Sequence, residues 1–260
     1  EARRITGRAV MTEHDANLAP GLLRAPVHAD SIAFTEWYLD SHPCTTARVP
    51  GGLEEGKAML HQETFPGQIS YRCLLPQGVD NLLVPVCLSA THVAWGTVRL
   101  EPVWMQTGEA AGLAAALALK NKTAPAQLNP DLLVRALCKR RSMVSFFNDV
   151  DVSANEPWIT AVQYFGTKGF FDNYDARMGE PLRQAIGKVW VDGLKKLRDG
   201  KFDPMAQAAA VVQATKIESK AMTADEFDAL LAASSSAPKT QTSKVIARGE
   251  AMTRMFQSIQ

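Results

Sequence analysis

The sequence contains few cysteines, and they lie far apart. Of its 260 residues, four are cysteine (Cys44, Cys73, Cys87 and Cys138), and no two of them have CxxC spacing. Zinc sites and redox pairs use closely spaced cysteines, and small disulfide-stapled domains use them densely. The pattern therefore argues against a zinc site and a disulfide framework, and it favours buried, unreactive thiols.

Long apolar runs and an excess of charge are also lacking. The best candidate for a membrane segment, residues 113–119, is far shorter than the about 20 residues that span a bilayer, so we expect no membrane span. The formal net charge is +1, so no bulk electrostatic attraction directs the chain to nucleic acid. A hydrophobic content of 46% indicates an ordinary globular protein.

The first part of the chain has β-type composition interrupted by turns. We predict extended segments over residues 4–12, 31–39 and 71–75, with mainly loop in the Pro- and Gly-rich stretch 41–67. The apolar run Leu82-Leu83-Val84-Pro85-Val86 fits a buried strand of a parallel sheet.

A helix is predicted from Pro102 to Lys120, because proline suits the first helical position. One face of this helix, which includes Gly108 and Gly112, carries almost no side-chain volume. Glycine inside a helix costs about 1 kcal/mol relative to alanine. We therefore expect close backbone approach there, through tight packing on a sheet, room for a cofactor, or both.

Beyond a linker at residues 121–130 the pattern is helical. Proline after a polar residue opens several of the segments, and Thr223 to Glu226 forms a capping box. The predicted helices cover residues 130–141, 157–168, 181–198, 204–219 and 223–233. Residues 129–233 are thus expected to form a helical domain, and residues 234–260 a flexible tail with a loosely held helix at its end.

Five motifs follow one another between Tyr71 and Leu119: Tyr-Arg-x-Leu-Leu-Pro, Asn-Leu-Leu-Val, Leu-Ser-Ala-Thr-His-Val-Ala, Val-Arg-Leu-Glu-Pro and Gly-Glu-Ala-Ala-Gly. In order and spacing this stretch resembles the closing segment of FAD-dependent oxidoreductases of the glutathione-reductase type, in particular bacterial members described as xanthan-lyase-like. The resemblance implies a mixed α/β fold. Residues 1–78 would belong to a β-rich substrate domain, and residues 79–122 would form the last strand and helix of a Rossmann-like FAD-binding domain.

The resemblance also implies a cofactor, FAD, and a place for it. In the family the helix matched here by residues 102–120 points its amino terminus at the flavin ring, where its partial positive charge favours the reduced, anionic form. The residues expected to contact the cofactor lie in this first turn and in the preceding loop: Ser89, Ala90, Thr91, Pro102, Val103, Trp104, Met105 and Gly108.

Three side chains near the expected flavin are candidates for catalysis. His92 is either an acid–base group or a structural histidine that ties the loop to the sheet. Arg99 and Glu101 are two residues apart, so on an extended segment they would share a face. There they would clamp a substrate carboxylate and accept a proton, or they would pair with neighbouring side chains.

One element of the family pattern is absent. No GxGxxG sequence occurs in the chain, and this turn is what cradles the pyrophosphate. We therefore expect this chain alone to bind FAD poorly. The sequence begins Glu1-Ala2-Arg3 without an initiator methionine, so we expect an upstream FAD-binding segment of the same protein. The whole protein would be a bacterial enzyme of the cytoplasm or periplasm that transfers a hydride between a small organic substrate and flavin.

The carboxy-terminal half carries a second, weaker likeness. Phe147-Asn148-Asp149-Val150, Trp158, the Gly169 turn and Pro181 resemble one copy of an S-layer homology motif. The apolar residues of this stretch are more simply the core of a helical hairpin. The alternative function is a non-catalytic protein whose helical region binds a cell wall or a partner. Lys188, Lys195, Lys196, Arg198 and Lys201 are interleaved with aspartates, which is typical of a solvated face.

Overall fold

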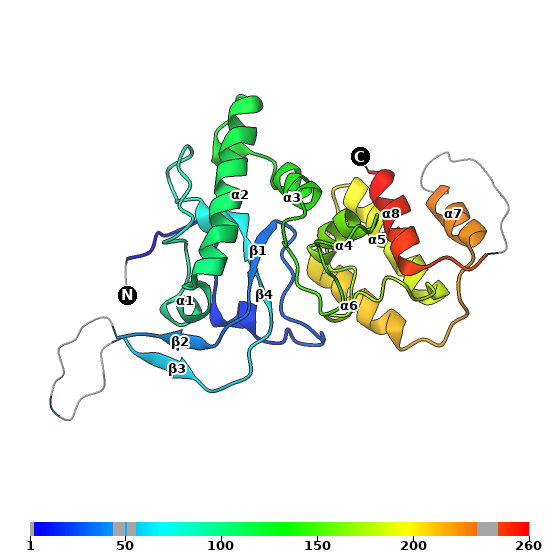
Figure 1. The fold of residues 1–260 in the computed structure, drawn as a ribbon, viewed down its shortest axis with the longest axis horizontal. Coiled ribbons are helices and arrows are strands. Elements are labelled where there is room, and N and C mark those ends of the chain that lie inside the picture. The colour runs from blue at the N-terminus through cyan, green and yellow to red at the C-terminus, as the bar shows by residue number, and fades with distance from the viewer. Residues whose placement is uncertain (1–2, 44–49, 51–55, 233–243, 260) are drawn as a thin grey trace.

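The computed structural model describes residues 3–43, 50, 56–232 and 244–259. Two parts lie side by side: one holds the strands and helices α1 to α3, and the other consists of helices α4 to α8 (Figure 1). The fold is mixed α/β, which confirms the predicted class. None of the helices in the described ranges has the length and hydropathy that a bilayer crossing needs.

The strands form two small antiparallel pairs. β1 (Ser31–Thr35) pairs with β4 (Gly67–Ser70), and β2 (Leu39–Ser41) pairs with β3 (Ala58–Leu60). The extended segment predicted at 31–39 is thus split into two strands. The strand predicted at 71–75 is wrong: Tyr71–Leu74 is a 3-10 helix, because the Ser70 side chain accepts a hydrogen bond from the Arg72 N–H and starts a turn.

The buried parallel strand predicted at residues 82–86 is also wrong. This segment joins no named strand, and Leu82 and Val86 are each 47% exposed. Single backbone bonds hold it: the Val84 N–H donates to Leu74 O at 2.9 Å, and the Ile5 N–H donates to Cys87 O at 3.1 Å. An apolar run becomes a buried strand only where neighbours cover it on both sides, and the described residues leave one side of this run uncovered.

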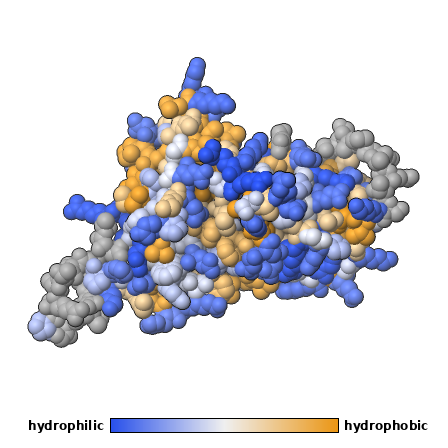
Figure 2. Space-filling model, viewed as in Figure 1, coloured by the Kyte–Doolittle hydropathy of each residue, from blue (hydrophilic) through white to orange (hydrophobic). Residues whose placement is uncertain are grey.

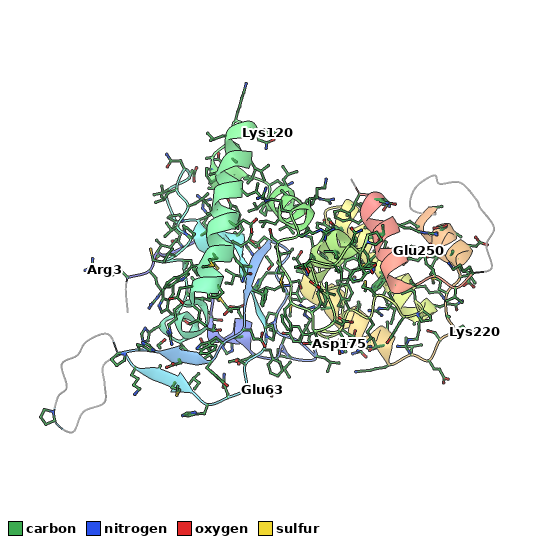
Figure 3. The ribbon with its side chains drawn as sticks, in the orientation of Figure 1. Arg3, Glu63, Lys120, Asp175, Lys220 and Glu250 are labelled. Carbon is green, nitrogen blue, oxygen red and sulfur yellow. The ribbon has the colours of Figure 1, made fainter. Side chains whose placement is uncertain are left out.

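Helices α1 (His92–Val98) and α2 (Glu101–Lys120) pack against the strands. The buried face of α2 lies along β1 and includes Val103, Thr107 and Ala110, while Lys120 marks its outer end (Figures 1 and 3). The expected close approach at Gly108 and Gly112 is not found, since a Cβ atom at either position would meet nothing within 4 Å.

Close backbone approach occurs instead at Gly96, on α1. A Cβ atom there would lie 2.3 Å from the backbone N of Asp40 in β2. This contact lets α1 lie directly on the β2–β3 pair.

The predicted helices are present, with shifted ends: α3 (Pro130–Lys139), α4 (Ile159–Gly166), α5 (Gln184–Arg198), α6 (Pro204–Thr215), α7 (Ala224–Ala232) and α8 (Arg248–Gln257). The capping box is confirmed, because the Thr223 N–H donates to Glu226 Oε2 at 2.8 Å and the Glu226 N–H donates to Thr223 Oγ1 at 3.3 Å. Within the tail predicted at 234–260, residues 233–243 lie outside the described residues. Helix α8 buries Met252 and Met255 completely, so it is a core element and not a loosely held end.

Three extended segments meet in a closed ring and set the geometry of the helical part. The Leu182 N–H donates to Ile246 O at 2.9 Å, the Ile246 N–H donates to Met222 O at 3.0 Å, and the Met222 N–H donates to Leu182 O at 2.7 Å. All three side chains are at most 1% exposed. Each segment enters a helix two residues later: α5, α7 and α8 begin at Gln184, Ala224 and Arg248.

An outer set of bonds joins the same three segments in the reverse cyclic order. The N–H groups of Gln184, Ala224 and Arg248 donate to the carbonyls of Lys220, Lys244 and Glu180, each at 2.9 Å. A short extended segment that leads into a helix is therefore present three times in this part of the molecule. Lys220 and Glu250 lie at the periphery of this arrangement (Figure 3).

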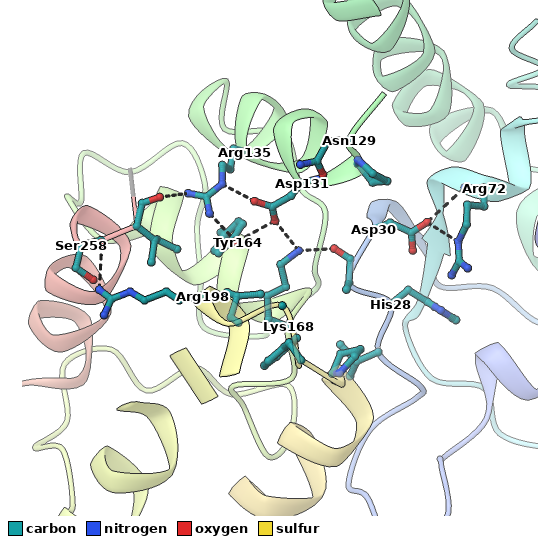
Figure 4. A pocket seen from close by; sticks show the side chains of 18 residues that line it. His28, Asp30, Arg72, Asn129, Asp131, Arg135, Tyr164, Lys168, Arg198 and Ser258 are labelled. Atoms are coloured by element: carbon teal, nitrogen blue, oxygen red, sulfur yellow. Dashed lines mark hydrogen bonds and ion pairs between the residues drawn. The ribbon is translucent and has the colours of Figure 1, made fainter. Parts of the chain in front are cut away.

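A buried polar cluster joins the two parts of the molecule. Asp131, in the first turn of α3, lies 2.6 Å from Arg135 Nε and 3.0 Å from Lys168 Nζ, and it accepts the Tyr164 hydroxyl at 2.9 Å (Figure 4). The Lys168 ammonium also donates to Ala29 O in the other part, at 2.5 Å. Burial alone would raise the pKa of Asp131, but Lys168 and Arg135 outweigh it and hold that pKa below its ordinary value.

Substituting Gly96→Ala should destabilise the fold by about 1–3 kcal/mol, because the methyl group overpacks the contact with β2. The matched control is Gly112→Ala, which is helical and open and should gain about 0.5–1 kcal/mol from helix propensity. Urea unfolding of the two variants tests this. Equal stabilities would show that α1 does not touch β2 at Gly96.

Substituting Asp131→Asn should destabilise the protein at neutral pH by about 3 kcal/mol, because the buried Lys168 and the half-buried Arg135 lose their carboxylate. Since the pKa of Asp131 is depressed in the fold, its stabilisation is fully present above the ordinary value of 3.8 and declines as the pH falls through the lower folded value. Urea unfolding at a series of acid pH values should therefore show a smaller acid-induced loss in the variant than in the parent.

The control for Asp131→Asn is Glu109→Gln, which removes an exposed ion pair with Arg140 at 3.3 Å. It should change the stability by less than about 1 kcal/mol. A comparable loss in both variants would contradict a special role for Asp131.

Candidate functional site

The candidate site is the α1–α2 corner, defined here as residues 89–108. The backbone of its first residues is hydrogen-bonded to the amino-terminal segment of the chain. The Thr91 N–H donates to Met11 O at 2.8 Å, and the Met11 N–H donates to Ser89 O at 3.0 Å. The Arg4 side chain donates to Ala90 O at 3.2 Å. The loop therefore enters α1 in a fixed register.

Thr91 begins α1 by capping it. Its Oγ1 accepts a hydrogen bond from the Ala94 N–H at 3.1 Å, as is usual for a threonine at this position. Ser89 is buried and lies against Gly7, whose backbone leaves no room for a larger neighbour. The hydroxyl of Thr91 thus serves the local fold, and Ser89 is occupied in packing and backbone pairing.

The ring of His92 has partners on both nitrogens. Nε2 contacts the Gly56 carbonyl oxygen. Because a carbonyl oxygen can only accept a hydrogen bond, Nε2 is the nitrogen that donates. Nδ1 lies 3.5 Å from an Arg4 NH2 group and faces a donor. This arrangement matches a structural imidazole that holds the loop, one of the two roles expected for His92.

Arg99 and Glu101 do not lie on an extended segment, so the expectation of a shared strand face is wrong. Arg99 is the C-cap residue of α1, and Glu101 is the first residue of α2. The Arg99 guanidinium donates from Nε to Asp40 O at 2.9 Å and from NH2 to Asp40 Oδ2 at 3.2 Å. Glu101 is exposed at the surface.

The first turn of α2 is open. Leu100 provides no side-chain cap, Pro102 is exposed, and Met105 is 73% exposed. Val103 is buried beneath this turn. Trp104 packs near Trp95, with ring centroids 6.3 Å apart, and within the described structure its buried Nε1–H has no acceptor. A buried donor without a partner calls for an explanation in a native protein.

The corner therefore offers a ligand three features: the positive end of a twenty-residue helix, an unpartnered indole N–H, and the open surface at Gly108. A flat, electron-rich or anionic ring suits them. Ser89, Thr91 and His92 lie just before or at the start of α1, which leads directly into α2. Arg99 is directed towards Asp40 in β2.

The thiols take no part in such a site. Burial raises the pKa of Cys73 and of Cys138 to about 12. A thiol that stays protonated at neutral pH is a poor nucleophile. The expectation of buried, unreactive cysteines is confirmed for these two, while Cys44 lies outside the described residues.

Sequence reasoning missed a second group of interacting polar side chains, which lies between the two parts of the molecule. Arg135, Tyr164 and Lys168 meet there around Asp131. The one available signal was a lysine flanked by aromatic residues, in Tyr164-Phe165-Gly166-Thr167-Lys168-Gly169-Phe170. Such a lysine is rarely buried without a partner. Arg198, which the sequence assigned to a solvated face, also lines this region.

The comparisons with known proteins concern the amino-terminal half of the chain. The family model described as FAD dependent oxidoreductase matches residues 1–137, more than half of the chain. No curated protein and no solved structure matches. The match covers the whole α1–α2 corner and ends within α3. The chain belongs to the family of FAD-dependent oxidoreductases, whose cofactor is FAD.

Proposed function

We propose that the α1–α2 corner is the flavin-facing wall of an oxidoreductase that acts on a small organic substrate. The family match over residues 1–137 carries this proposal. Bound FAD would supply hydride transfer at N5 of its ring. The chain's own residues would position the ring, and the positive end of α2 would favour negative charge beside it.

The residues at the start of α2 fit such a ring. Trp104 offers the unpartnered Nε1–H, and Gly108 leaves the adjoining surface open. Pro102, Val103 and Met105 complete the turn. In this proposal Ser89, Ala90 and Thr91 hold the loop that borders the ring, which accords with their backbone bonds to the amino-terminal segment.

The phosphate cradle of FAD has no counterpart in these 260 residues, since GxGxxG does not occur. We propose that a segment outside them supplies it. An apolar surface supports this idea: Met105 and Leu119 on α2 are 73% and 80% exposed, and Leu82 and Val86 are each 47% exposed. Hydrophobic surface gathers over α2 in Figure 2. Exposed apolar patches of this kind mark contact surfaces.

Catalytic roles are proposed for three residues of the corner. Glu101, exposed beside the first turn of α2, would accept the substrate proton. Arg99, held by Asp40, would bind a substrate carboxylate in competition with that aspartate. His92 would act as an acid–base group only if it released Gly56 or Arg4, so its supporting role is the simpler one.

Substituting Trp104→Phe in the chain extended to include its phosphate-binding segment should weaken FAD binding about tenfold. The ring stays, but one hydrogen bond from a buried donor is lost, which corresponds to about 1.5 kcal/mol. Equilibrium titration followed by flavin fluorescence measures the effect. Trp37→Phe is the control, because Trp37 is 42% exposed on the strand side of the molecule. Equal FAD affinity in both variants would remove Trp104 from the site.

A second candidate function is supported by the threefold ring of strand–helix units. We propose that the helical part attaches the protein to a cell-wall polymer or a partner, as the likeness to an S-layer homology motif implies. A groove of about 520 Å³ between α5 and α6 supports this. Gln184, Lys188, Gln213 and Ser219 provide polar groups along it, and alanines and Ile217 form its apolar side.

Sedimentation of the chain with purified bacterial cell walls tests the attachment function. Lys188→Ala should reduce the bound fraction several-fold, because it removes the cation of the groove. Lys120→Ala, at the exposed end of α2, should leave binding unchanged. If the parent chain stays in the supernatant, or if the two variants bind alike, attachment through this groove is wrong.

A further inference from the structure

A cleft of about 900 Å³ lies between the two parts of the molecule (Figure 4). Its size is that of a site for a small organic ligand. Residues 27–30 and Arg72 line it from one part, the start of α3 lines its rim, and residues from α4, the α5–α6 connection and the chain end line the rest. None of these residues belongs to the α1–α2 corner, so the cleft is separate from the proposed flavin site.

The floor of the cleft is a built polar cluster with an excess of positive charge. Lys168, whose side chain is 2% exposed, and Arg135 share the single carboxylate of Asp131, at 3.0 Å and 2.6 Å. The Tyr164 hydroxyl donates to the same carboxylate and accepts from Arg135 NH2, both at 2.9 Å. Burial lowers the pKa of Lys168, and Asp131 opposes that shift. Two basic side chains therefore share one carboxylate, which leaves the cluster with one formal positive charge in excess.

The rim adds further positive charge. Arg72 and Arg198 lie on opposite walls, one in each part of the molecule, with His28 near Arg72 (Figure 4). Arg72 pairs through Nε with Asp30 at 3.1 Å, and Arg198 NH2 donates to Ser258 O at 3.0 Å. Each of these bonds fixes the direction of a guanidinium group. Two acidic residues line the cleft, Asp30 and Asp131, against four arginines and lysines. The lining therefore has an excess of basic side chains, which attracts anions.

The remaining lining is apolar and lies beside these charges. Val27, Pro130, Leu197, Phe202 and Ile259 form the non-polar wall. A free inorganic ion would leave this wall in contact with water. A molecule with one anionic group and an apolar body would cover it and gain burial as well as charge pairing.

We propose that this cleft binds a small organic anion, one that carries a phosphate or carboxylate group on an apolar body. Arg72 contacts the anionic group at the rim, and Lys168 and Arg135 provide the positive floor. Phe202, Leu197 and Ile259 enclose the body. Because both parts of the molecule supply contacts, the bound ligand also holds them together.

Calorimetric titration of the whole chain with phenyl phosphate, benzoate, inorganic phosphate and phenol tests the proposal. We expect phenyl phosphate or benzoate to bind at least about tenfold more tightly than phenol or inorganic phosphate, because each combines both chemistries. The stronger of the two identifies the anionic group. The same ligand should raise the thermal unfolding midpoint, because it binds the folded state alone.

The variant for this test is Arg72→Ala, at the rim and away from the Asp131 cluster. It should weaken binding of the preferred anion by about tenfold or more. Arg140→Ala, which removes an exposed cation that pairs with Glu109 outside the cleft, should bind as the parent does. No saturable binding of either organic anion overturns the proposal, as does equal binding by the rim variant or by phenol. FAD binding is measured separately, so failure here leaves the flavin proposal standing.

Discussion

The carboxylate of Asp131 is the contact on which the arrangement of this molecule depends. It lies in the first turn of α3, near the end of the segment that matches the oxidoreductase family. It is held by two cations and a hydroxyl, and Lys168 reaches past it to the carbonyl of Ala29. A lysine that is 2% exposed cannot be left unpaired without a loss of several kcal/mol. The position of α4 relative to the amino-terminal part is therefore set by charge pairing as well as by apolar packing.

The closed ring of three backbone hydrogen bonds sets a second constraint. Each of Leu182, Met222 and Ile246 donates to one neighbour and accepts from the other. Buried backbone groups need partners, and the ring provides them without a sheet. Helix α8 is far along the chain from α5, yet it is fixed by this ring. The Arg135 guanidinium then donates to Ile259 O just beyond α8, so the ring and the Asp131 cluster are connected.

Local signals in the sequence predicted the helices well, because helix caps depend on side chains that lie close in sequence to the groups they bind. Asn129 accepts from the Asp131 N–H and Asp203 accepts from the Met205 N–H, each just before a proline at the helix start. These interactions span two residues and need no tertiary partner. The third proline signal, Glu156-Pro157, was less exact, because α4 begins at Ile159, two residues after Pro157.

Predictions that depended on distant partners fared worse. The run at residues 82–86 has the composition of a buried strand, but composition does not reveal whether neighbouring strands are present. The glycines of α2 indicated close approach, and the tight contact is at Gly96 instead. Arg99 and Glu101 were placed on one face by assuming a strand, whereas a helix boundary separates them. The family, the cofactor and the helix that bears the expected site followed from the motif order, but the partners of individual side chains did not.

The exposed first turn of α2 is consistent with membership of a flavoprotein family. A helix end that is meant to face a ring must stay uncapped by side chains, and Leu100 provides no cap. It must also keep donors ready, and we propose that the unpartnered Nε1–H of Trp104 is one of them. Met105 leaves a large apolar side chain exposed in this turn, beside the exposed carboxylate of Glu101. The combination of an uncapped positive helix end, a buried orphan donor and an exposed apolar side chain is that of a surface made to be covered.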